Sequence, residues 1–360
     1  MNMEQLAKQW GTLYRNRGYS HYAMSKFEEY ELYLRNKDFL ISDRVLTFTD
    51  TDGKLMALKP DVTLSIIKNT DDSVSGVQKL YYQENVYRPG KNQQGFREIM
   101  QVGLECIGNV DTYCVFEVLY LAAKSLEQIG KRWVLDISHM GLLAHLLDKS
   151  GLTGNERSNV IKAISEKNAH EVRKICQAAG ADPTELARIA DLSGSAFAVM
   201  PELEQIFADA PELQGLKLLT NALADAGVDS INIDFSVIND MNYYNGIVFR
   251  GFVEGVPERV LSGGQYDGMM QKMRRQNKAI GFALYPDLLE RLLPAEATTS
   301  ADAVLLYSAD ATLSQIEKTV TELTGKGMCV NTQPAGGEIP RGCKVFQLDG
   351  NEVKCIENDA

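Results

Sequence analysis

The feature that most constrains the fold of this chain is the alternation in residues 101–106, whose sequence is QVGLEC. A period of two is typical of a β-strand and places Gln101, Gly103 and Glu105 on one face. The glycine removes a side chain between two polar groups, so the pattern predicts a cavity on that face. A carboxylate beside an amide can hold an ammonium group or an imidazole there. The alternative is that this face is the solvated side of an antiparallel sheet.

Three other segments also concentrate polar groups among apolar residues, namely Leu58–Thr63, Tyr87–Arg88 and Asn242–Gly246. Each motif is short, and alone each is compatible with a solvated sheet surface. The pair Tyr243–Tyr244 fits a pocket wall, but it fits ordinary packing in the core and at its rim equally well. The basic residues of Lys272–Lys278 fit a solvated loop or a contact with an anion or a partner.

Composition limits the class of protein. The chain has 360 residues, of which 44% are hydrophobic, and this excludes intrinsic disorder. With 37 basic and 48 acidic residues its net charge is −11, so nucleic-acid binding would require a local basic groove. No apolar run reaches the roughly 18 residues of a membrane span, and the start lacks the regions of a signal peptide. We therefore expect a cytoplasmic protein that does not enter a membrane.

The sequence gives no sign of a metal or cofactor. Its six cysteines are scattered without a C-x-x-C pair, which favours buried free thiols over a zinc site or a disulfide framework. The four histidines show no metal-ligand spacing. The P-loop, the Rossmann glycine motif and the hydrolase nucleophile elbow are all absent from the sequence. We therefore predict neither a metal nor a cofactor.

Hydrophobic periodicity predicts an α+β fold with two domains. Residues 1–293 are expected to form a core with an antiparallel sheet flanked by helices. A helical insertion is expected at about residues 151–227, with no strand inside it. A linker at 294–302 leads to a small C-terminal α/β domain at 303–360.

Local signals add two expectations near the end of the core. The glycines of Ser262–Gly264 predict a bend after the strand Gly246–Val253. Apolar periodicity then predicts a final helix over Pro286–Leu293.

Taken in order and spacing, the polar segments resemble the catalytic core of histidyl-tRNA synthetases, which are class II synthetases. The resemblance covers residues 1–293 and makes a solvated sheet surface improbable as the whole explanation. Leu58–Thr63 is similar to the family segment L-R-P-E-G-T, and Leu80–Gly108 to motif 2 with its Q-x-G-x-E strand. Asn239–Phe249 is similar to R-G-L-D-Y-Y-x-x-T-V-F, and Ser262–Gly268 to E-G-G-R-Y-D-G. The resemblance implies a class II synthetase-like antiparallel sheet.

The resemblance also assigns a histidine-binding site. In that family the positions matching Asp61, Thr63 and Gln101 hold the α-ammonium region of the amino acid, and those matching Glu105 and Tyr244 hold its imidazole. A carboxylate and a phenol can satisfy both imidazole nitrogens, while a second carboxylate neutralises the ammonium. The implied histidine-binding residues are Asp61, Thr63, Gln101, Glu105, Tyr243 and Tyr244.

Two arginines that the family uses to form the aminoacyl adenylate are replaced in this sequence. The arginine that touches the substrate carboxylate and α-phosphate falls at Asn239, and the motif 3 arginine that clamps ATP falls at Leu288. A shifted alignment would instead place Arg291 at the second position. Phosphoryl-type transfer depends on positioned positive charge, so these losses predict that no catalytic residue remains.

Part of an anion or nucleotide site is retained. Arg88 matches the motif 2 arginine and Arg97 matches a second arginine in its loop, but the glutamate expected beside them is Gly90. The family's motif 1 proline, which belongs to its dimer contact, falls at Ser25. We interpret Arg88 and Arg97 as a possible remnant of the nucleotide site.

The tail from Ser300 to Ala360 is shorter than the anticodon-binding domain of that family, so specific tRNA binding is not expected. A synthetase core that keeps the amino-acid pocket without the chemistry resembles the regulatory subunits of ATP phosphoribosyltransferase. That resemblance implies a non-catalytic subunit, a short-form catalytic subunit as partner, free histidine as feedback ligand, and self-dimerisation within a hetero-oligomer. The alternatives are a divergent histidyl-tRNA synthetase and another enzyme that activates histidine.

Overall fold

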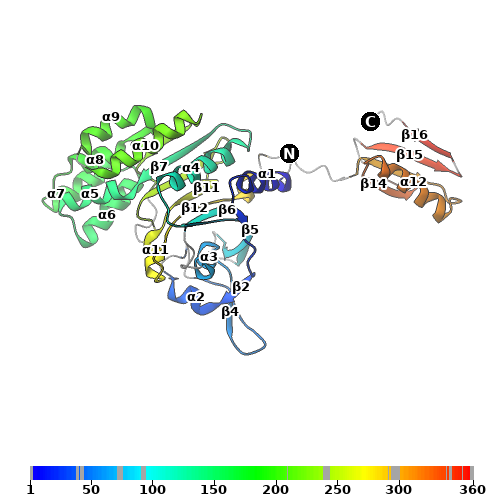
Figure 1. The fold of residues 1–360 in the computed structure, drawn as a ribbon, viewed down its shortest axis with the longest axis horizontal. Helices are drawn as coiled ribbons and strands as arrows, with labels where there is room; N and C mark the ends of the chain where they lie inside the picture. The colour runs from blue at the N-terminus through cyan, green and yellow to red at the C-terminus, as the bar shows by residue number, and fades with distance from the viewer. Residues whose placement is uncertain are drawn as a thin grey trace. The chain divides into compact units, whose positions relative to one another are not determined.

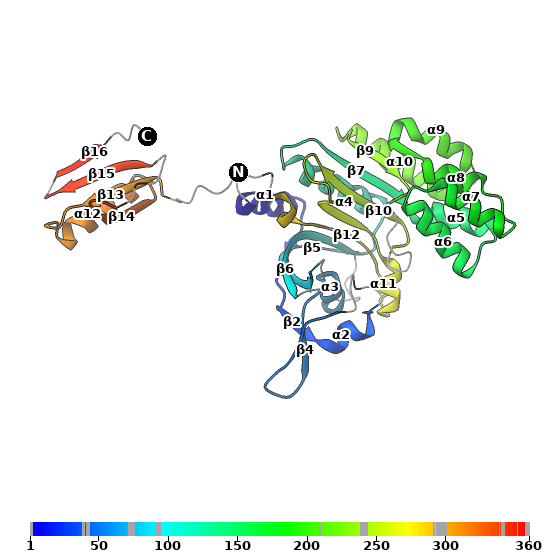
Figure 2. The same ribbon diagram turned by 180° about the vertical axis from the view of Figure 1, so that it is seen from behind.

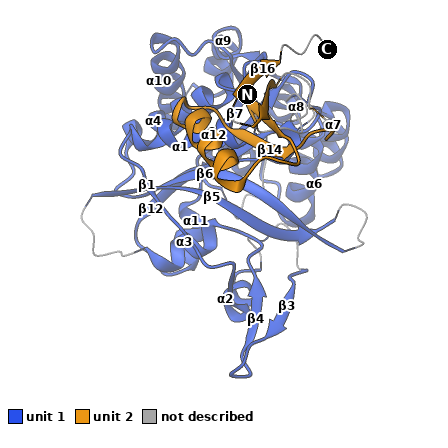
Figure 3. Ribbon diagram, turned by 90° about the vertical axis from the view of Figure 1, so that its right-hand side faces the viewer, with its two compact units in different colours: residues 1–293 blue, residues 294–360 orange. Residues whose placement is uncertain are grey.

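The protein is described by a computed structural model that covers residues 3–37, 40, 44–70, 76–90, 95–208, 210–237, 244–290, 292, 301–337, 339, 343–350 and 352–356. The chain divides into two compact units, Met1–Leu293 and Pro294–Ala360 (Figure 3). Helices and sheets are mixed in both units, as the predicted α+β class requires.

A nine-stranded sheet runs through the first unit in the order β1-β5-β6-β12-β11-β10-β7-β9-β8 (Figure 1). Its strands are Ser20–His21 (β1), Val77–Pro89 (β5), Phe96–Gly108 (β6), Trp133–His139 (β7), Ser193–Ser195 (β8), Ile231–Asp234 (β9), Ile247–Val253 (β10), Leu261–Gln265 (β11) and Lys278–Leu284 (β12). The pairs β1–β5 and β7–β9 are parallel, and the other pairs are antiparallel. The antiparallel prediction therefore holds for the long central strands.

Two helices, Met3–Arg15 (α1) and Thr112–Glu127 (α4), pack on one face of this sheet. The indole Nε1 of Trp10 donates to the carbonyl of Ser125 over 3.0 Å, and the hydroxyls of Tyr14 and Ser125 are 2.8 Å apart. These buried hydrogen bonds fix α1 against α4. The apolar residues of β6 on this face, Val102, Leu104 and Cys106, join the same core.

The opposite face is covered in part by a second layer. It contains the helices Tyr30–Arg35 (α2), Thr63–Asn69 (α3) and Asp267–Lys272 (α11), together with a three-stranded sheet, β2-β4-β3, made of Phe27–Glu29 (β2), Thr47–Thr49 (β3) and Leu55–Leu58 (β4). Leu64 and Ile66 of α3 pack with Tyr82, Val86 and Ile107 of the large sheet in a separate apolar core. This layer leaves the polar side chains of β6 beside α3.

Six helices follow β7 and gather beside the end of the sheet that carries β9 (Figures 1 and 2). They are Met140–Ser150 (α5), Gly154–Ser165 (α6), Ala169–Ala178 (α7), Thr184–Asp191 (α8), Ala196–Ile206 (α9) and Pro211–Asp225 (α10). The expectation that this region holds no strand is wrong, because β8 pairs with β9. Three residues with a central glycine carry no periodic pattern, and only the pairing defines β8 as a strand.

Two further local predictions are wrong. Ser262–Gly264 does not bend but lies inside β11, where its glycines admit close neighbours from β12 and β10. The predicted final helix is only a 3-10 turn, Pro286–Leu289 (η2). Asp287 accepts a hydrogen bond from the backbone N–H of Met100 over 3.2 Å, which ties this turn to β6.

The second unit holds Ala303–Tyr307 (β13), Leu313–Gly325 (α12), Val330–Pro334 (β14), Lys344–Asp349 (β15) and Glu352–Ile356 (β16). The sheet order is β14-β13-β15-β16, with β13 parallel to both neighbours and β16 antiparallel to β15. A capping box between Thr312 and Gln315 begins α12. The core of this unit includes Val304 and Val345.

The cysteines are free, as expected, and four of them are buried. Cys329 and Cys355 are exposed, so the expectation of burial is wrong for these two, which lie in or beside the small sheet of the second unit. No helix in the described part of the chain is long and apolar enough to cross a membrane.

Gly281 of β12 provides a test of this packing. A Cβ at this position would lie 1.8 Å from Oε2 of Glu105 and 2.5 Å from the carbonyl of Leu104, so Gly281→Ala should destabilise the first unit by roughly 2–3 kcal/mol. Gly215 in the interior of α10 has no atom within 4 Å of such a Cβ, and Gly215→Ala should stabilise by about 0.5–1 kcal/mol. Urea unfolding of both variants measures the difference, and equal stabilities would contradict this packing.

Candidate functional site

Glu105 is the centre of the candidate site. It lies in β6 between Leu80 of β5 and Gly281 of β12, and only 2% of its surface is exposed. The hydroxyl of Thr63 donates to Oε1 over 2.8 Å, and the hydroxyl of Tyr266 donates to Oε2 over 2.5 Å. The polar face of β6 is therefore a buried site, and the alternative of a solvated sheet surface is wrong.

The segment before α3 brings a second carboxylate to this site. Asp61 accepts a hydrogen bond from the backbone N–H of Leu64 over 3.0 Å, which fixes its side chain at the start of the helix. The guanidinium of Arg88 lies 3.7 Å from Asp61 and donates through Nε to the carbonyl of Pro60 over 2.8 Å. Asp61 therefore lies at the site with one arginine, Arg88, close to its carboxylate.

A buried ion pair supports the same segment. Lys59 is 1% exposed and pairs with Glu84 of β5, and Glu84 also accepts from the backbone N–H of Met24. Glu84 lies opposite Gln101 in the β5–β6 ladder. Gln101 is 3% exposed, and its amide makes no hydrogen bond to another residue in the described part of the chain. Its donor and acceptor groups therefore remain available to a ligand.

The cavity predicted at Gly103 is occupied. A Cβ on Gly103 would lie 2.5 Å from the hydroxyl of Tyr82 and 2.3 Å from the carbonyl of Phe282. Gly103 therefore makes room for the Tyr82 phenol, which comes from the residue opposite it in the ladder. The glycine is needed because a side chain of the neighbouring strand packs against it. The expectation of an empty space above Gly103 is therefore wrong.

Glycines do make room for site residues on the neighbouring strands. Gly281 accommodates the carboxyl group of Glu105, and a Cβ on Gly264 would lie 2.6 Å from the ring of Tyr244. The hydroxyl groups of Ser262 and Tyr285 are 2.9 Å apart. Tyr244 and Tyr285 therefore add phenols beside the two carboxyl groups.

The structure brings Asp61, Thr63, Gln101, Glu105 and Tyr244 into one region, and Arg88 joins them through Asp61. Arg97 lies opposite Arg88 in the ladder, but its side chain is exposed. Leu288, at the position of the family's ATP arginine, packs against the main apolar core. The predicted residues Tyr243, Asn239 and Arg291 lie outside the described residues.

Sequence reasoning missed several phenols of the site, among them Tyr82 and Tyr266. Both are buried, and Tyr266 donates directly to Glu105. Tyr266 belongs to the segment that resembles E-G-G-R-Y-D-G, which was a signal for it. Tyr82 could have been found only from the register of β5 against β6, which places it opposite Gly103.

Burial controls the charge of the site. It raises the pKa of Glu105 to about 8, although the hydrogen bonds from Tyr266 and Thr63 oppose the rise. Burial also raises the pKa of Asp61, against the attraction of Arg88. The pKa values of Tyr82 and Tyr244 rise as well, chiefly through burial. A site with two carboxyl groups and these neutral phenols is suited to a cationic or proton-donating ligand.

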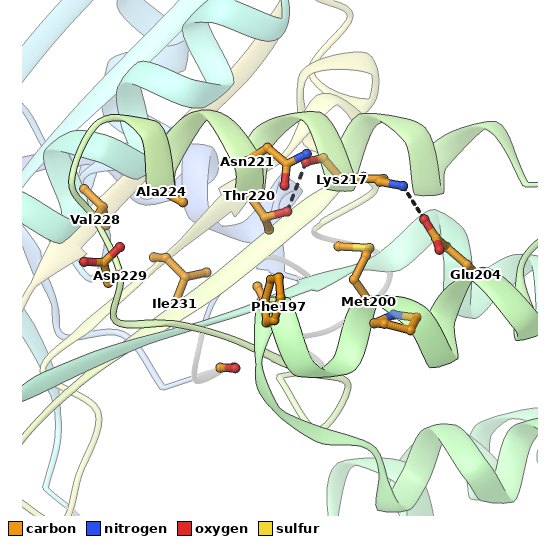
Figure 4. A pocket seen from close by; sticks show the side chains of 13 residues that line it. Phe197, Met200, Glu204, Lys217, Thr220, Asn221, Ala224, Val228, Asp229 and Ile231 are labelled. Atoms are coloured by element: carbon orange, nitrogen blue, oxygen red, sulfur yellow. Dashed lines mark hydrogen bonds and ion pairs between the residues drawn. The ribbon is translucent and has the colours of Figure 1, made fainter.

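A separate cavity of about 540 Å³ lies between α9 and α10 (Figure 4). Met200, Pro201 and Ile231 line its apolar part, and Glu204 forms an ion pair with Lys217 at its edge. None of the predicted site residues lines this cavity. Among the described residues, no cluster of histidine, cysteine or acidic side chains could hold a metal ion.

The fold defines a class II synthetase-like domain, and buried carboxyl groups and phenols gather around Glu105 on one face of its sheet. The family model described as histidyl-tRNA synthetase matches residues 1–289, and the chain belongs to this family. The predicted family resemblance and class II fold are thus confirmed.

Curated relatives include two kinds of protein. An ATP phosphoribosyltransferase regulatory subunit from Oceanobacillus iheyensis is 28% identical over 303 residues, covering 81% of this chain and 73% of the relative. A histidine–tRNA ligase from Methanosarcina acetivorans is 28% identical over 318 residues, covering 86% and 76%.

Solved structures agree on the fold. An ATP phosphoribosyltransferase regulatory subunit/histidyl-tRNA synthetase from Bacillus halodurans C superimposes with a TM-score of 0.80 at 23% identity, covering 94% of this chain and 90% of that one. A chain of an ATP phosphoribosyltransferase complex from Thermotoga maritima gives a TM-score of 0.63 at 19% identity, covering 78% and 96%.

Glu105 should make the stability of the ligand-free chain depend on pH. Its pKa rises from 4.5 to about 8 on folding, so the folded state holds more protons between these values. The free energy of unfolding should therefore fall by up to a few kcal/mol as the pH rises through this window. Glu105→Gln cannot lose a proton and should flatten the dependence in urea unfolding. A variant with the slope of the wild type would contradict the buried carboxyl.

Proposed function

We propose that this chain is a non-catalytic regulatory subunit of ATP phosphoribosyltransferase that binds histidine in the Glu105 site. Two observations together carry the proposal: the buried Glu105 site has the polar groups of an amino-acid site, and Leu288 stands where the family has an arginine. Glu105 is held by Thr63 and Tyr266, whereas Leu288 packs into the apolar core. These two observations support a site that binds the amino acid but lacks a charge that the family's chemistry needs.

Histidine suits the groups that the site presents. Its imidazole has two nitrogens. The Glu105 carboxyl group can accept a hydrogen bond from one of them, and the Tyr244 phenol can donate to or accept from the other. Its ammonium group suits the carboxylate of Asp61 and the amide oxygen of Gln101. An ammonium near Asp61 would also lower the pKa of both carboxyl groups, so binding and ionisation of the site reinforce each other.

Adenylate formation is not part of the proposed function. The reaction develops negative charge on the α-phosphate, and positioned cations stabilise that charge. Arg88 is engaged with Asp61 and the Pro60 carbonyl, and Leu288 offers no charge. The remaining cations are Arg88 and the exposed Arg97, and these two provide little positioned charge to stabilise an α-phosphate. The divergent synthetase and other histidine-activating enzymes are therefore the less favoured functions.

The proposed partner is the short-form catalytic subunit of ATP phosphoribosyltransferase, in the cytoplasm. Several relatives carry the name of the regulatory subunit, and one superimposed chain comes from an ATP phosphoribosyltransferase complex. The mechanism is linkage, in which histidine binds one arrangement of the complex more tightly than another and so changes the activity of the partner. Specific tRNA binding is not proposed, because the net charge of −11 opposes a polyanion.

The small sheet β2-β4-β3 supports a self-dimer within the hetero-oligomer. Phe27 and Phe48 are 45% and 36% exposed, and their ring centroids are 5.5 Å apart. Leu55 on β4 is 48% exposed, and Leu34 on α2 is 52% exposed. Two exposed apolar rings side by side on β2 and β3, with further exposed leucines on β4 and α2, favour a contact with another chain.

Assembly is the direct test of this function. Mixing the chain with a short ATP phosphoribosyltransferase catalytic subunit should give one complex in size-exclusion chromatography and an activity that exceeds that of either chain alone. Two separate peaks at micromolar concentration would contradict the proposal. Histidine-dependent ATP–pyrophosphate exchange by the lone chain would favour the synthetase function instead.

Histidine binding is tested separately by calorimetry on the chain alone and on the complex. Glu105→Ala removes the carboxyl partner of the imidazole, which costs about 1.5–3 kcal/mol and weakens binding roughly ten- to a hundredfold. Glu254→Ala, which removes an exposed carboxylate paired with Arg132, is the matched control and should bind as the wild type does. Binding that Glu105→Ala leaves unchanged would place the histidine site elsewhere.

A further inference from the structure

The cavity between α9 and α10 is separate from the candidate site, and each helix presents a stripe of residues to it (Figure 4). Along each helix the lining residues are three, four or seven positions apart, namely Phe197, Met200 and Glu204 on α9, and Lys217, Asn221 and Ala224 on α10. Residues at these spacings lie on one face of a helix. The cavity is therefore bounded along its length by two helix faces, and we call it the α9–α10 groove.

The groove has an apolar lining and an exposed aromatic ring at its edge. Met200 and Ile231 line it and are buried, whereas Phe197, at the start of α9, is 93% exposed. A small molecule that filled the groove would leave much of this ring in water. A protein surface can cover the ring and the groove together, and large aromatic side chains are frequent anchors in such contacts.

The charges differ between the two ends of the groove (Figure 4). At one end Glu204 and Lys217 form an ion pair, so their charges compensate each other. At the other end Asp229 lines the groove, and Asp225 follows Ala224 as the last residue of α10. In the part of the chain that the structure describes, neither aspartate has a hydrogen bond or an ion pair through its side chain. This end therefore carries uncompensated negative charge and suits a lysine or an arginine of a partner.

The helices of the chain itself do not fit the groove. A helix that binds in a groove does so through several apolar side chains on one face. Among the described residues, each helix exposes at most one large apolar side chain; these are Leu34 of α2, Tyr113 of α4, Phe197 of α9, Leu218 of α10 and Leu313 of α12. A second copy of this chain therefore offers no suitable helix, and a different protein is the better partner.

We propose that the α9–α10 groove binds an amphipathic helix of the catalytic subunit. The apolar side chains of that helix lie against Phe197 and Met200, and a lysine or arginine near its end lies beside Asp229. This inference rests on the proposed function, which supplies the partner. It gives the helices that follow β7 a role in assembly. None of the groove residues belongs to the Glu105 site, so assembly and histidine binding can be tested separately.

The first test measures the affinity of the full chain for a purified short-form catalytic subunit by calorimetry. Phe197→Ser removes the exposed ring, and Ala224→Trp places a large side chain in the groove at an exposed position. Each variant should weaken binding about ten- to a hundredfold. Leu313→Ser is the matched control, because it removes an apolar side chain that is 86% exposed on α12, and it should bind as the wild type does.

The second test concerns the charge at the end of the groove. Asp229→Lys replaces attraction by repulsion, so it should weaken binding and reduce the loss of affinity that the wild type shows as the salt concentration rises. All four variants change exposed side chains, and they should unfold in urea at the wild-type concentration and bind histidine as the wild type does.

The outcomes separate this inference from the proposed function. A catalytic subunit that binds Phe197→Ser and Ala224→Trp as tightly as the wild type would overturn the groove as its docking site. The same result together with weaker self-association of these variants would assign the groove to a second copy, which also overturns the inference. A wild-type chain that does not bind the catalytic subunit would overturn the proposed function itself, and the inference with it.

Discussion

A carboxyl group inside a sheet sets the conditions that the rest of the first unit meets. Burying Glu105 costs free energy unless each of its oxygens finds a partner, and Thr63 and Tyr266 provide those partners. The side chain also needs space, which Gly281 provides on the next strand. Residues from α3, β6, β12 and the junction between β11 and α11 are therefore required together, and none of them forms the site alone.

The two faces of the sheet differ in character: one is apolar and packs against helices, and the other carries the candidate site. Helices α1 and α4 cover one face with an apolar core, and burial of this core stabilises the sheet. The other face carries buried acids, phenols and glycines, and polar residues continue along it as far as Arg250 and Asp136. Such a face lowers stability in the absence of a ligand, because buried groups such as Glu105 and Asp61 are forced toward their neutral forms.

The same scaffold is compatible with the proposed change from an enzyme to a regulatory subunit. A histidine pocket needs acids and phenols, whereas adenylate chemistry also needs cations placed around a phosphate. Replacing an arginine by Leu288 removes one of these cations and adds apolar contact to the core. The hydrogen bonds of Glu105 do not involve this position, so the proposed ligand could still favour one arrangement of a complex over another.

The sequence by itself determined the polar strand, the pair Gln101 and Glu105, the family of the fold and the missing arginine at Leu288, because period-two alternation and motif order are local properties. Only the tertiary structure decided that Tyr82 fills the space above Gly103 and that Ser193–Ser195 and Ser262–Gly264 belong to strands. Each of these facts depends on the register between segments distant in sequence. Register is fixed by packing and hydrogen bonds across strands, which no single segment encodes.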